Sequence, residues 1–259
     1  MKVVVYVLAY DEESHAAAKR EYADKPWARV ATLPDALPES KYMEGAAFLK
    51  LLADRRAEWA DAEFVGTVSW KASTKIDIPP NFLRVCEDVR HADVVALMPS
   101  TEHLLKQAMR CHPRFLETWV PLLEKMGYRA QDAVSIDVPC FVCNYFLMKP
   151  ATMDAFIEFY RRAVAVMETD PELQGSLWAD SGYGTHLSAD RLTRLYGKPY
   201  IPYHPFIGER LACFFTFTSK LALAMLPLGR GSHWEKHYEW ELRDVQARAD
   251  HFAQTLGFR

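Results

Sequence analysis

Short runs of apolar, largely β-branched residues alternate with amphipathic patterns over the first 150 residues of the chain. The runs at 2–9, 64–70 and 93–98 predict strands, because each is brief, contains several valines and is bounded by polar residues or proline. The segments between them carry apolar residues at helical spacing. Alternation of this kind is typical of an α/β fold. We therefore expect a mostly parallel central sheet flanked by helices.

The remaining patterns complete this architecture. Additional strands are expected at 28–33 and 140–148. Helices are expected at 11–24, 40–53, 79–89, 103–111, 113–125 and 153–167.

The last third of the chain has a different pattern. Residues 174–184 are loop-like, Pro205 opens a helix, and the apolar stretch 211–226 is typical of a buried helix. A capping box at 232–235 predicts a final helix that ends at Gly257. No polar linker separates the parts, so we expect a single domain over 1–259, with a core at 1–170 and a helical C-terminal annex within 171–259.

Composition excludes several classes of protein. The chain has 259 residues, of which 50% are hydrophobic and 25% charged, so a disordered or low-complexity chain is excluded. The net charge of −3 argues against nucleic acid as the main partner. The start lacks a signal-peptide pattern, and the apolar stretch 211–226 is too short and too interrupted to span a membrane. We expect a cytoplasmic protein without a transmembrane segment, and peripheral association with a membrane stays open.

The five cysteines and nine histidines give no metal or redox motif. Cys140 and Cys143 form a C-x-x-C pair inside an apolar run, without the second ligand pair that zinc needs, and we expect plain buried thiols. His233 and His237 are spaced i, i+4, which on a helix beginning in solvent favours a polar face over a metal pair. We therefore assign no metal-ligating residues.

Ligands of open α/β sheets bind at the carboxyl ends of the strands, so the residues that follow each expected strand are candidates for a site. Tyr10 and Asp11 follow the first strand. The ring suits stacking on a nucleoside base, and the carboxylate suits ribose hydroxyls. The alternative for Asp11 is that it caps the next helix.

The second clear strand contains Gly66, which is costly in a strand unless something approaches the backbone closely. Thr67 and Ser69 share one face, and Lys71 and Lys75 follow the strand. Hydroxyls and cations beside a glycine suit a diphosphate. The alternative is a solvated edge loop. A P-loop and a dinucleotide-binding glycine motif are both absent.

Three segments carry a family resemblance. Residues 64–71 (FVGTVSWK) resemble a strand of small GT-A-like glycosyltransferases from bacterial capsule and lipopolysaccharide clusters and from large DNA viruses. Residues 143–149 (CNYFLMK) and the helix after them are similar to the Asn-aromatic-aromatic-x-Met strand and helix of these enzymes. Residues 203–211 (YHPFIGERL) are similar to their late Phe-x-x-Glu-Arg-Leu segment. The order agrees and, with the N-terminal strand, covers most of the chain.

The resemblance implies a GT-A-like (Rossmann-like) fold, with a nucleotide-sugar-binding core at 1–170 and an acceptor-side loop and helices at 171–259. It implies a hexosyl- or deoxyhexosyltransferase that moves a sugar from a nucleoside diphosphate donor to a glycan acceptor, in surface polysaccharide or glycoprotein glycan synthesis. The alternatives are a non-catalytic, degenerate GT-A domain that binds a nucleotide sugar or glycan, and another nucleotide-using α/β enzyme.

Residue roles follow from this chemistry. An inverting transferase needs a carboxylate that takes the acceptor proton, and the candidates are Glu209, Asp180 and Asp137. The alternative for Glu209 is an ordinary i, i+4 ion pair or a buried structural partnership with Arg210. Arg210 joins Lys71 and Lys75 as a cation for the leaving diphosphate. Asn144 and Tyr145 are expected to face the acceptor, with sheet packing as the alternative.

The metal is the departure from the family pattern. GT-A enzymes usually hold Mn²⁺ or Mg²⁺ with Asp-x-Asp at the end of a buried strand, whereas here the strand at 93–98 ends in the sequence PST. We therefore expect no strict requirement for a divalent metal.

Overall fold

The computed structural model describes residues 1–33, 39–184, 187–226 and 228. They form an α/β fold around a mixed six-stranded sheet with the order β2-β1-β3-β5-β4-β6. The strands are β1 (Val3–Ala9), β2 (Ala28–Thr32), β3 (Phe64–Ser69), β4 (Val94–Ala96), β5 (Phe146–Met148) and β6 (Leu223–Met225). Only β5 is antiparallel to its neighbours in this sheet, and the other strand pairs are parallel. The expected α/β class is thus confirmed, and the sheet is mixed, with three of its five strand pairs parallel.

The four inner strands of the sheet are buried along their whole length. Every residue of β1, β3, β4 and β5 is buried, whereas the two edge strands β2 and β6 are only partly covered. Inner strands with helices on both faces have no solvent-facing side, so an unbroken run such as VVVYVLA is stable there. The sheet therefore forms the centre of the hydrophobic core.

Helices and helical turns connect the strands. They are α1 (Glu12–Tyr22), the 3₁₀ segment η1 (Glu39–Gly45), the π-helical turn η2 (Ala47–Leu51), α2 (Leu52–Asp54), α3 (Arg56–Trp59), α4 (Ala72–Lys75), α5 (Phe82–Asp88), α6 (Leu104–Cys111), α7 (Phe115–Lys125), α8 (Ala130–Ala133), α9 (Pro150–Thr169), α10 (Pro171–Leu177), α11 (Ala189–Tyr196) and α12 (His204–Thr218).

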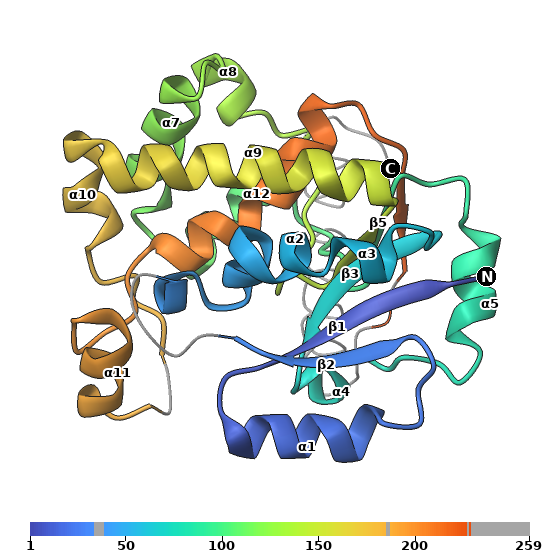
Figure 1. The fold of residues 1–259 in the computed structure, drawn as a ribbon. Helices are drawn as coiled ribbons and strands as arrows, with labels where there is room; N and C mark the ends of the chain where they lie inside the picture. Colours follow the sequence, from blue (N-terminus) through green and yellow to red (C-terminus); the bar gives the residue numbers. More distant parts are fainter. Residues whose placement is uncertain (34–38, 185–186, 227, 229–259) are drawn as a thin grey trace, which may run out of the picture.

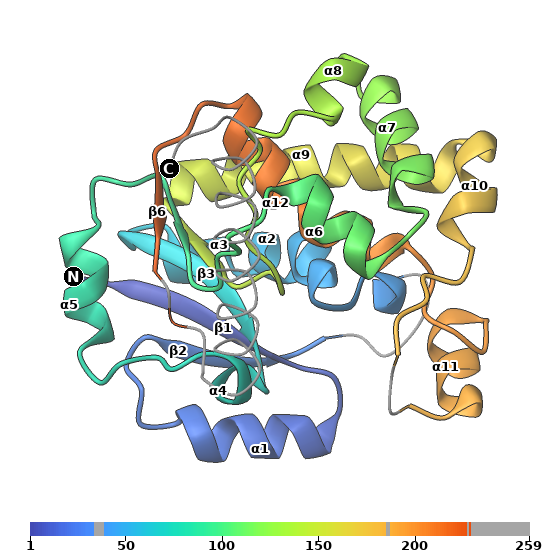
Figure 2. The same cartoon turned by 180° about the vertical axis from the view of Figure 1, so that it is seen from behind.

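Helices lie on both faces of the sheet. In Figure 1, α1 lies below β1 and β2, whereas α2, α3 and the long helix α9 lie above them. The ring of Trp27 contacts Tyr22 of α1 and Phe82 of α5, which joins these two helices on one face. On the other face, Phe146 of β5 packs against Phe156 of α9 and against Phe48. Figure 2 shows α6 and α12 from behind, beside the β-strand layer.

Three expected elements differ from the structure. The expected strand 140–148 is reduced to β5, because Cys143 and Asn144 have left-handed φ angles of 66° and 55° that interrupt an extended chain. The expected helix 40–53 is divided into η1, η2 and α2, with a break at Met43 (φ 49°, ψ −127°). The expected helix 211–226 ends at Thr218, and the chain re-enters the sheet as β6.

The other expected strands and helices in the described residues agree with the structure to within a few residues, including the helix after Pro205 and the long helix α9. The helices α10 and α11 were not expected, and α10 occupies the first residues of the segment 174–184 that we expected to be a loop. The final helix, its capping box, and His233 and His237 lie outside the described residues. In the described part of the chain, none of the helices combines the length and apolar character needed to cross a bilayer.

Candidate functional site at the carboxyl edge of the sheet

Polar side chains from five segments meet where β1 and β3 end. Leu8 pairs with Ser69, so these parallel strands end side by side. Because β5 runs in the opposite direction, the residues before it reach the same edge. The group, hereafter the carboxyl-edge cluster, is formed by Tyr10, Glu44, Lys75, Cys143, Tyr145 and Glu209. All except Tyr145 keep part of their surface open to solvent.

Glu209, in the second turn of α12, is held from two sides. The backbone N–H of Cys143 donates to its Oε1, and the Arg210 guanidinium pairs with its Oε2. The Arg210 side chain is only 3% exposed and donates a second hydrogen bond to Gln107 of α6. Burial opposes the charge of Arg210, but the Glu209 carboxylate outweighs it and the pKa of Arg210 is raised. Arg210 is thus a buried partner of Glu209, and the expectation that it faces a diphosphate directly is not supported.

The loop before β5 has an unusual backbone that supports the cluster. Two consecutive residues other than glycine, Cys143 and Asn144, have positive φ angles, which costs on the order of 1–3 kcal/mol each. The Asn144 carbonyl accepts a hydrogen bond from the Thr67 hydroxyl at 2.7 Å, and Tyr145 shares a hydrogen bond with Ser69. Asn144 and Tyr145 are buried, so the alternative of sheet packing holds for their side chains rather than direct contact with an acceptor.

Lys75, at the end of α4, supplies the positive charge of the cluster. Its Nζ lies 3.6 Å from the Cys143 sulfur and 5.6 Å from the centre of the Tyr145 ring. Burial disfavours the ammonium group, but Cys143, Tyr145 and the carboxylates of Glu44 and Glu209 outweigh this penalty and raise the pKa of Lys75. The side chain therefore stays charged, partly exposed and next to the strand ends.

Glu44 is the cluster residue that sequence reasoning missed. The break at Met43 ends the regular helical path of η1, and the carboxylate that follows accepts a hydrogen bond from the Tyr10 hydroxyl. Burial raises the pKa of Glu44 and the nearby Glu209 adds to the rise, whereas Tyr10 and Lys75 lower it. The only sequence signal is a carboxylate directly before a glycine inside an otherwise apolar helical pattern.

Two glycines adjacent to the cluster carboxylates allow close packing. Gly45 follows Glu44 and Gly208 precedes Glu209, and an added Cβ on either one would overlap the hydroxyl of Tyr160 in α9. Tyr160 is fully buried. The segments that carry the two carboxylates are therefore packed against the same aromatic side chain.

Several predicted donor contacts are corrected by the structure. Gly66 is fully covered because the Phe146 carbonyl of β5 occupies the space of a Cβ, so the neighbouring strand, rather than a ligand, requires this glycine. Thr67 and Ser69 are also buried, with their hydroxyls bonded to the loop before β5. Lys71 is exposed and lies over the Trp70 ring. Of the residues predicted around the diphosphate, only Lys75 combines charge, solvent access and the cluster position.

The other acidic candidates have local roles. Asp11 caps α1 through a capping box with Ser14, which favours the alternative reading, and these hydrogen bonds lower the pKa of Asp11. Asp180 is exposed and accepts a hydrogen bond from the backbone of Gly182. Asp137 is exposed and lines a pocket outside the carboxyl-edge cluster. Tyr10 does lie in the cluster, through its bond to Glu44.

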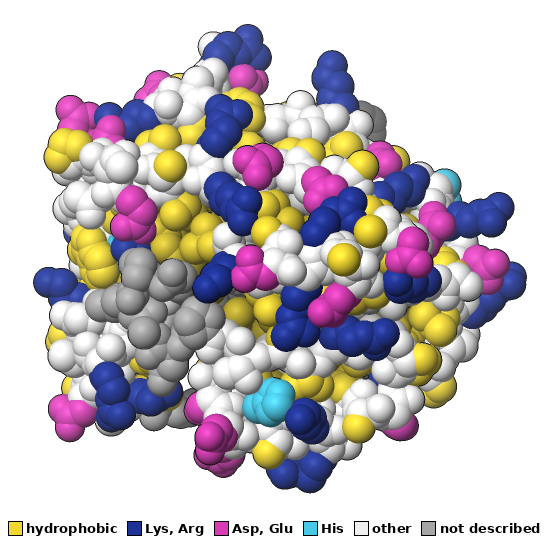
Figure 3. Space-filling view, in the orientation of Figure 1, with side chains coloured by type: hydrophobic (Ala, Val, Ile, Leu, Met, Phe, Trp, Pro, Cys, Tyr) yellow, Lys and Arg dark blue, Asp and Glu magenta, His cyan; other side chains and the backbone are white. Residues whose placement is uncertain are grey.

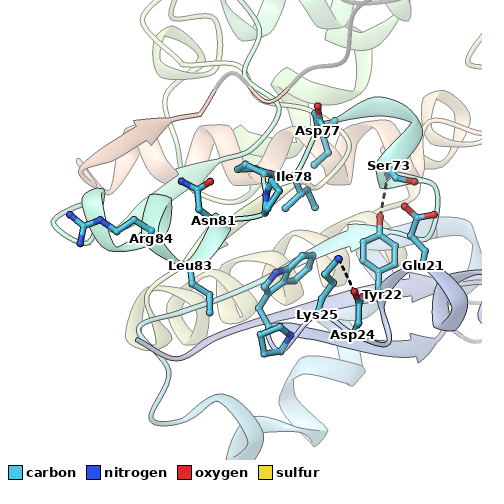
Figure 4. A pocket seen from close by; sticks show the side chains of 15 residues that line it. Glu21, Tyr22, Asp24, Lys25, Ser73, Asp77, Ile78, Asn81, Leu83 and Arg84 are labelled. Atoms are coloured by element: carbon cyan, nitrogen blue, oxygen red, sulfur yellow. Dashed lines mark hydrogen bonds and ion pairs between the residues drawn. The ribbon is translucent and has the colours of Figure 1, made fainter.

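Two surface pockets lie outside the cluster. One, of about 560 Å³, lies between the end of α1 and the segment from α4 to α5 (Figure 4). Trp27 is one of its lining residues, and the Tyr22 hydroxyl accepts a hydrogen bond from the Ser73 backbone within this lining. The other, of about 570 Å³, is formed by 99–103, 136–140 and Met225. Neither contains a member of the carboxyl-edge cluster, so we place the candidate site at the cluster, where the charges converge.

The surface beside α9 and α3 carries interspersed charges (Figure 3). Arg56, for example, pairs with Asp154 at 2.8 Å. This face therefore offers no continuous basic surface. Within residues 1–33, 39–184, 187–226 and 228, no three histidine, cysteine or acidic side chains converge as ligands of one metal ion.

Comparisons of the chain with protein-family models, with curated proteins and with solved structures found no match.

Proposed function

We propose that the protein is a glycosyltransferase that moves a hexosyl or deoxyhexosyl group from a nucleoside diphosphate sugar to a glycan acceptor. The proposal rests on the resemblance of the segments 64–71, 143–149 and 203–211 to GT-A-like enzymes. It also rests on where these segments meet. In the structure, Lys75 follows the first segment, Cys143 opens the second, and Glu209 lies in the third.

The observation that carries the proposal is that these three segments, together with Lys75 just after the first, meet at one sheet edge. Thr67 of the first segment donates a hydrogen bond to the Asn144 carbonyl of the second. Lys75 contacts the Cys143 sulfur, and the Cys143 backbone N–H donates to Glu209. Segments separated by more than 60 residues thus place an ammonium and a carboxylate at the strand ends, where open α/β sheets bind their ligands. A cation beside carboxylates is what transfer from a diphosphate donor requires.

We assign a separate role in the transfer reaction to each of these residues. The Lys75 ammonium neutralises charge that develops on the diphosphate as the bond to the sugar breaks. Tyr10, directly after β1, is positioned for the nucleoside side of the donor. A carboxylate of the cluster takes the proton of the acceptor hydroxyl. We propose a cytoplasmic location, because the five cysteines are free thiols, which suits a reducing compartment.

A second candidate function is a degenerate GT-A domain that binds a nucleotide sugar or glycan without transfer. One observation favours it: both oxygens of Glu209, the carboxylate in the resembling segment, are already engaged. Such a domain would bind donor and release no nucleoside diphosphate.

The experiment that separates the two functions is a panel of nucleoside diphosphate sugars, with thermal shift as the measure of binding and nucleoside diphosphate release as the measure of turnover. Ligand at 100 times its Kd adds roughly 2.7 kcal/mol of stability, which thermal shift detects. We expect both binding and release with at least one donor. Binding without release supports the degenerate domain. If no donor binds or is turned over, both the transferase and a domain that binds a nucleotide sugar are contradicted.

A further inference from the structure

Tyr183, in the segment 178–184 after α10, has an exposed aromatic ring. Its surface is 50% open to solvent. Every other phenylalanine, tyrosine and tryptophan in the described part of the chain is buried or half-buried. Tyrosine combines an apolar ring with a polar tip, so an exposed tyrosine is suited to contact a ligand that is itself partly apolar and partly polar.

The Tyr183 ring is packed against two buried rings. Its centre lies 5.1 Å from that of Phe206 in α12 and 6.3 Å from that of His112. His112 and Phe206 also contact each other, with ring centres 4.0 Å apart, and both are buried. These three rings are hereafter the aromatic platform. Tyr183 is the member of the platform that solvent reaches.

The backbone that carries Tyr183 is anchored. Ser181 is fully buried, and its backbone N–H and its hydroxyl both donate to the Ile201 carbonyl. The Ser181 carbonyl accepts a hydrogen bond from His112 Nδ1 at 3.2 Å. Gly182 then turns the chain with a φ of 70°, a conformation that glycine adopts without strain. The ring is therefore held in place before a ligand arrives, which lowers the entropy cost of binding.

The aromatic platform adjoins the carboxyl-edge cluster. Phe206 precedes Glu209 by three residues in α12, and residues with this spacing are neighbours on a helix surface. Glu209 accepts from the Cys143 N–H, and the Cys143 sulfur lies 3.6 Å from Lys75 Nζ. The charges of Lys75 and Glu209 also act on the Tyr183 hydroxyl, whose pKa is raised chiefly by burial. An exposed ring thus lies about one helical turn from an ammonium and a carboxylate.

A sugar ring has the chemistry that this arrangement fits. One face of a pyranose carries C–H groups, which pack on an aromatic ring, and its edge carries hydroxyls that need hydrogen-bond partners. Tyr183 offers the ring, and the cluster offers charged groups beside it. The donor nucleoside has its own aromatic residue in the proposed function, Tyr10 after β1, which leaves Tyr183 for the second substrate.

We propose that Tyr183 binds the glycan acceptor, with a sugar ring of the acceptor packed on the tyrosine ring and a hydroxyl directed toward the carboxyl-edge cluster. The inference rests on the proposed function and deepens it, because it names the surface that receives the acceptor. It also selects one contact residue within the segment 171–259, which the family resemblance assigns to the acceptor side.

The test compares Tyr183→Leu with Tyr183→Phe. Leucine keeps an apolar side chain without a flat ring, whereas phenylalanine keeps the ring and lacks only the hydroxyl. Ile136→Ala is the control, because Ile136 is 70% exposed and lines the pocket at 99–103 and 136–140, outside the cluster. Melting temperatures check the fold of all three variants. We expect them to change little, because the substituted side chains are exposed.

The probes are the methyl glycosides of glucose, galactose, mannose and N-acetylglucosamine, titrated by saturation-transfer-difference NMR. We expect at least one glycoside to bind to the wild type through the C–H protons of one ring face. Tyr183→Phe and Ile136→Ala are expected to bind it equally well, and Tyr183→Leu about tenfold more weakly. Absence of glycoside binding to the wild type, or equal binding to Tyr183→Leu, would overturn the proposal.

Nucleotide binding distinguishes an acceptor platform from a donor site. The Kd values of UDP, GDP, dTDP and ADP are measured by calorimetry for the wild type and for Tyr183→Leu. We expect Tyr183→Leu to leave them unchanged. A weaker Kd for a nucleotide together with unchanged glycoside binding would assign Tyr183 to the donor base and overturn the proposal.

Failure of the inference and failure of the proposed function give different results. If the wild type releases nucleoside diphosphate and Tyr183→Leu keeps both its glycoside binding and the KM of the acceptor, the role of Tyr183 is wrong while the transferase remains. If glycosides bind through Tyr183 but no donor is turned over, the transferase is wrong, and the sugar contact remains as that of a glycan-binding domain.

Discussion

The hydroxyl of Tyr160 occupies the space that a Cβ on Gly208 would need. Tyr160 comes from α9 and Gly208 from α12, so the absence of a side chain at 208 lets these two helices approach closely. Gly208 precedes Glu209, which bonds to the loop before β5. Packing between two helices thus sets the position of a carboxylate in the candidate site.

Gly208→Ala is expected to destabilise the protein, although alanine favours a helix over glycine by about 1 kcal/mol. The added methyl group overlaps the hydroxyl of a fully buried tyrosine, and overpacking of this kind costs about 1–3 kcal/mol. Tyr160→Phe removes the clashing hydroxyl. The double variant is therefore expected to recover most of the loss in urea unfolding. Equal losses for Gly208→Ala with and without Tyr160→Phe would contradict the contact.

Arg210→Met is expected to lower the free energy of unfolding by about 3–5 kcal/mol, because it leaves the Glu209 charge unpaired in a largely buried position. The matched control is Arg114→Met. Arg114 pairs with Glu117 on the surface, where both side chains are more than half exposed, and such pairs contribute only about 0–1 kcal/mol. Urea unfolding of both variants measures the difference. Similar small losses would show that Arg210 is solvated.

Glu44→Gln is expected to gain stability relative to the wild type as pH rises. The pKa of Glu44 is higher in the folded protein than in the unfolded chain, so the folded state binds its proton more strongly. The stabilisation that this stronger proton binding gives the wild-type protein is present below the unfolded-state pKa of Glu44 and is lost as the pH rises through its folded-state pKa. Lys75, Glu209 and Tyr10 are common to both proteins, so the difference reports on Glu44. Urea unfolding between pH 4 and 8 measures it, and a difference that stays constant would place Glu44 in solvent.

Lys75→Ala is expected to weaken binding of a nucleoside diphosphate by about tenfold or more, because hydrogen bonds to charged groups contribute about 1.5–3 kcal/mol. Binding of the matching nucleoside is expected to change little. Lys71→Ala is the control, since Lys71 lies four residues earlier but is exposed over Trp70. Calorimetric titrations decide the matter. Equal losses for nucleoside and diphosphate would remove Lys75 from the phosphate site.

Turnover is expected to survive an excess of chelator, because the sequence has PST at 99–101 where GT-A enzymes usually carry their metal-binding Asp-x-Asp. The Lys75 ammonium supplies the positive charge instead. Nucleoside diphosphate release is measured with chelator alone and after Mn²⁺ or Mg²⁺ is restored. Complete loss that either ion reverses would show that a metal takes part.

The sequence predicted those parts of the fold that depend on local pattern. The unbroken apolar run of β1 indicates a strand that is buried on both faces. The amphipathic pattern of α7 indicates a helix that is buried on one face. The backbone at Met43, Cys143 and Asn144 could not be predicted in this way. None of these residues is glycine, yet each has a positive φ angle, and at Cys143 a tertiary hydrogen bond from the backbone N–H to Glu209 holds the turn.

The candidate site was predicted only in part for the same reason. Three members of the cluster could be predicted from the sequence. Lys75 and Tyr10 are a charged and an aromatic residue near expected strand ends, and Glu209 lies in a resembling segment. Glu44 lies in an expected helix and becomes a site residue only because η1 breaks and turns its carboxylate toward Tyr10. For Gly66 the sequence correctly predicted a close approach to the backbone. The group that approaches is the neighbouring strand β5, whereas we expected a ligand.

A crystal structure with the nucleoside diphosphate that the donor panel identifies tests the central claim most directly. We expect phosphate oxygens within hydrogen-bond distance of Lys75 Nζ and the nucleoside beside Tyr10. A nucleotide bound instead in the pocket between α1 and α5, or in the pocket at 99–103 and 136–140, would contradict it.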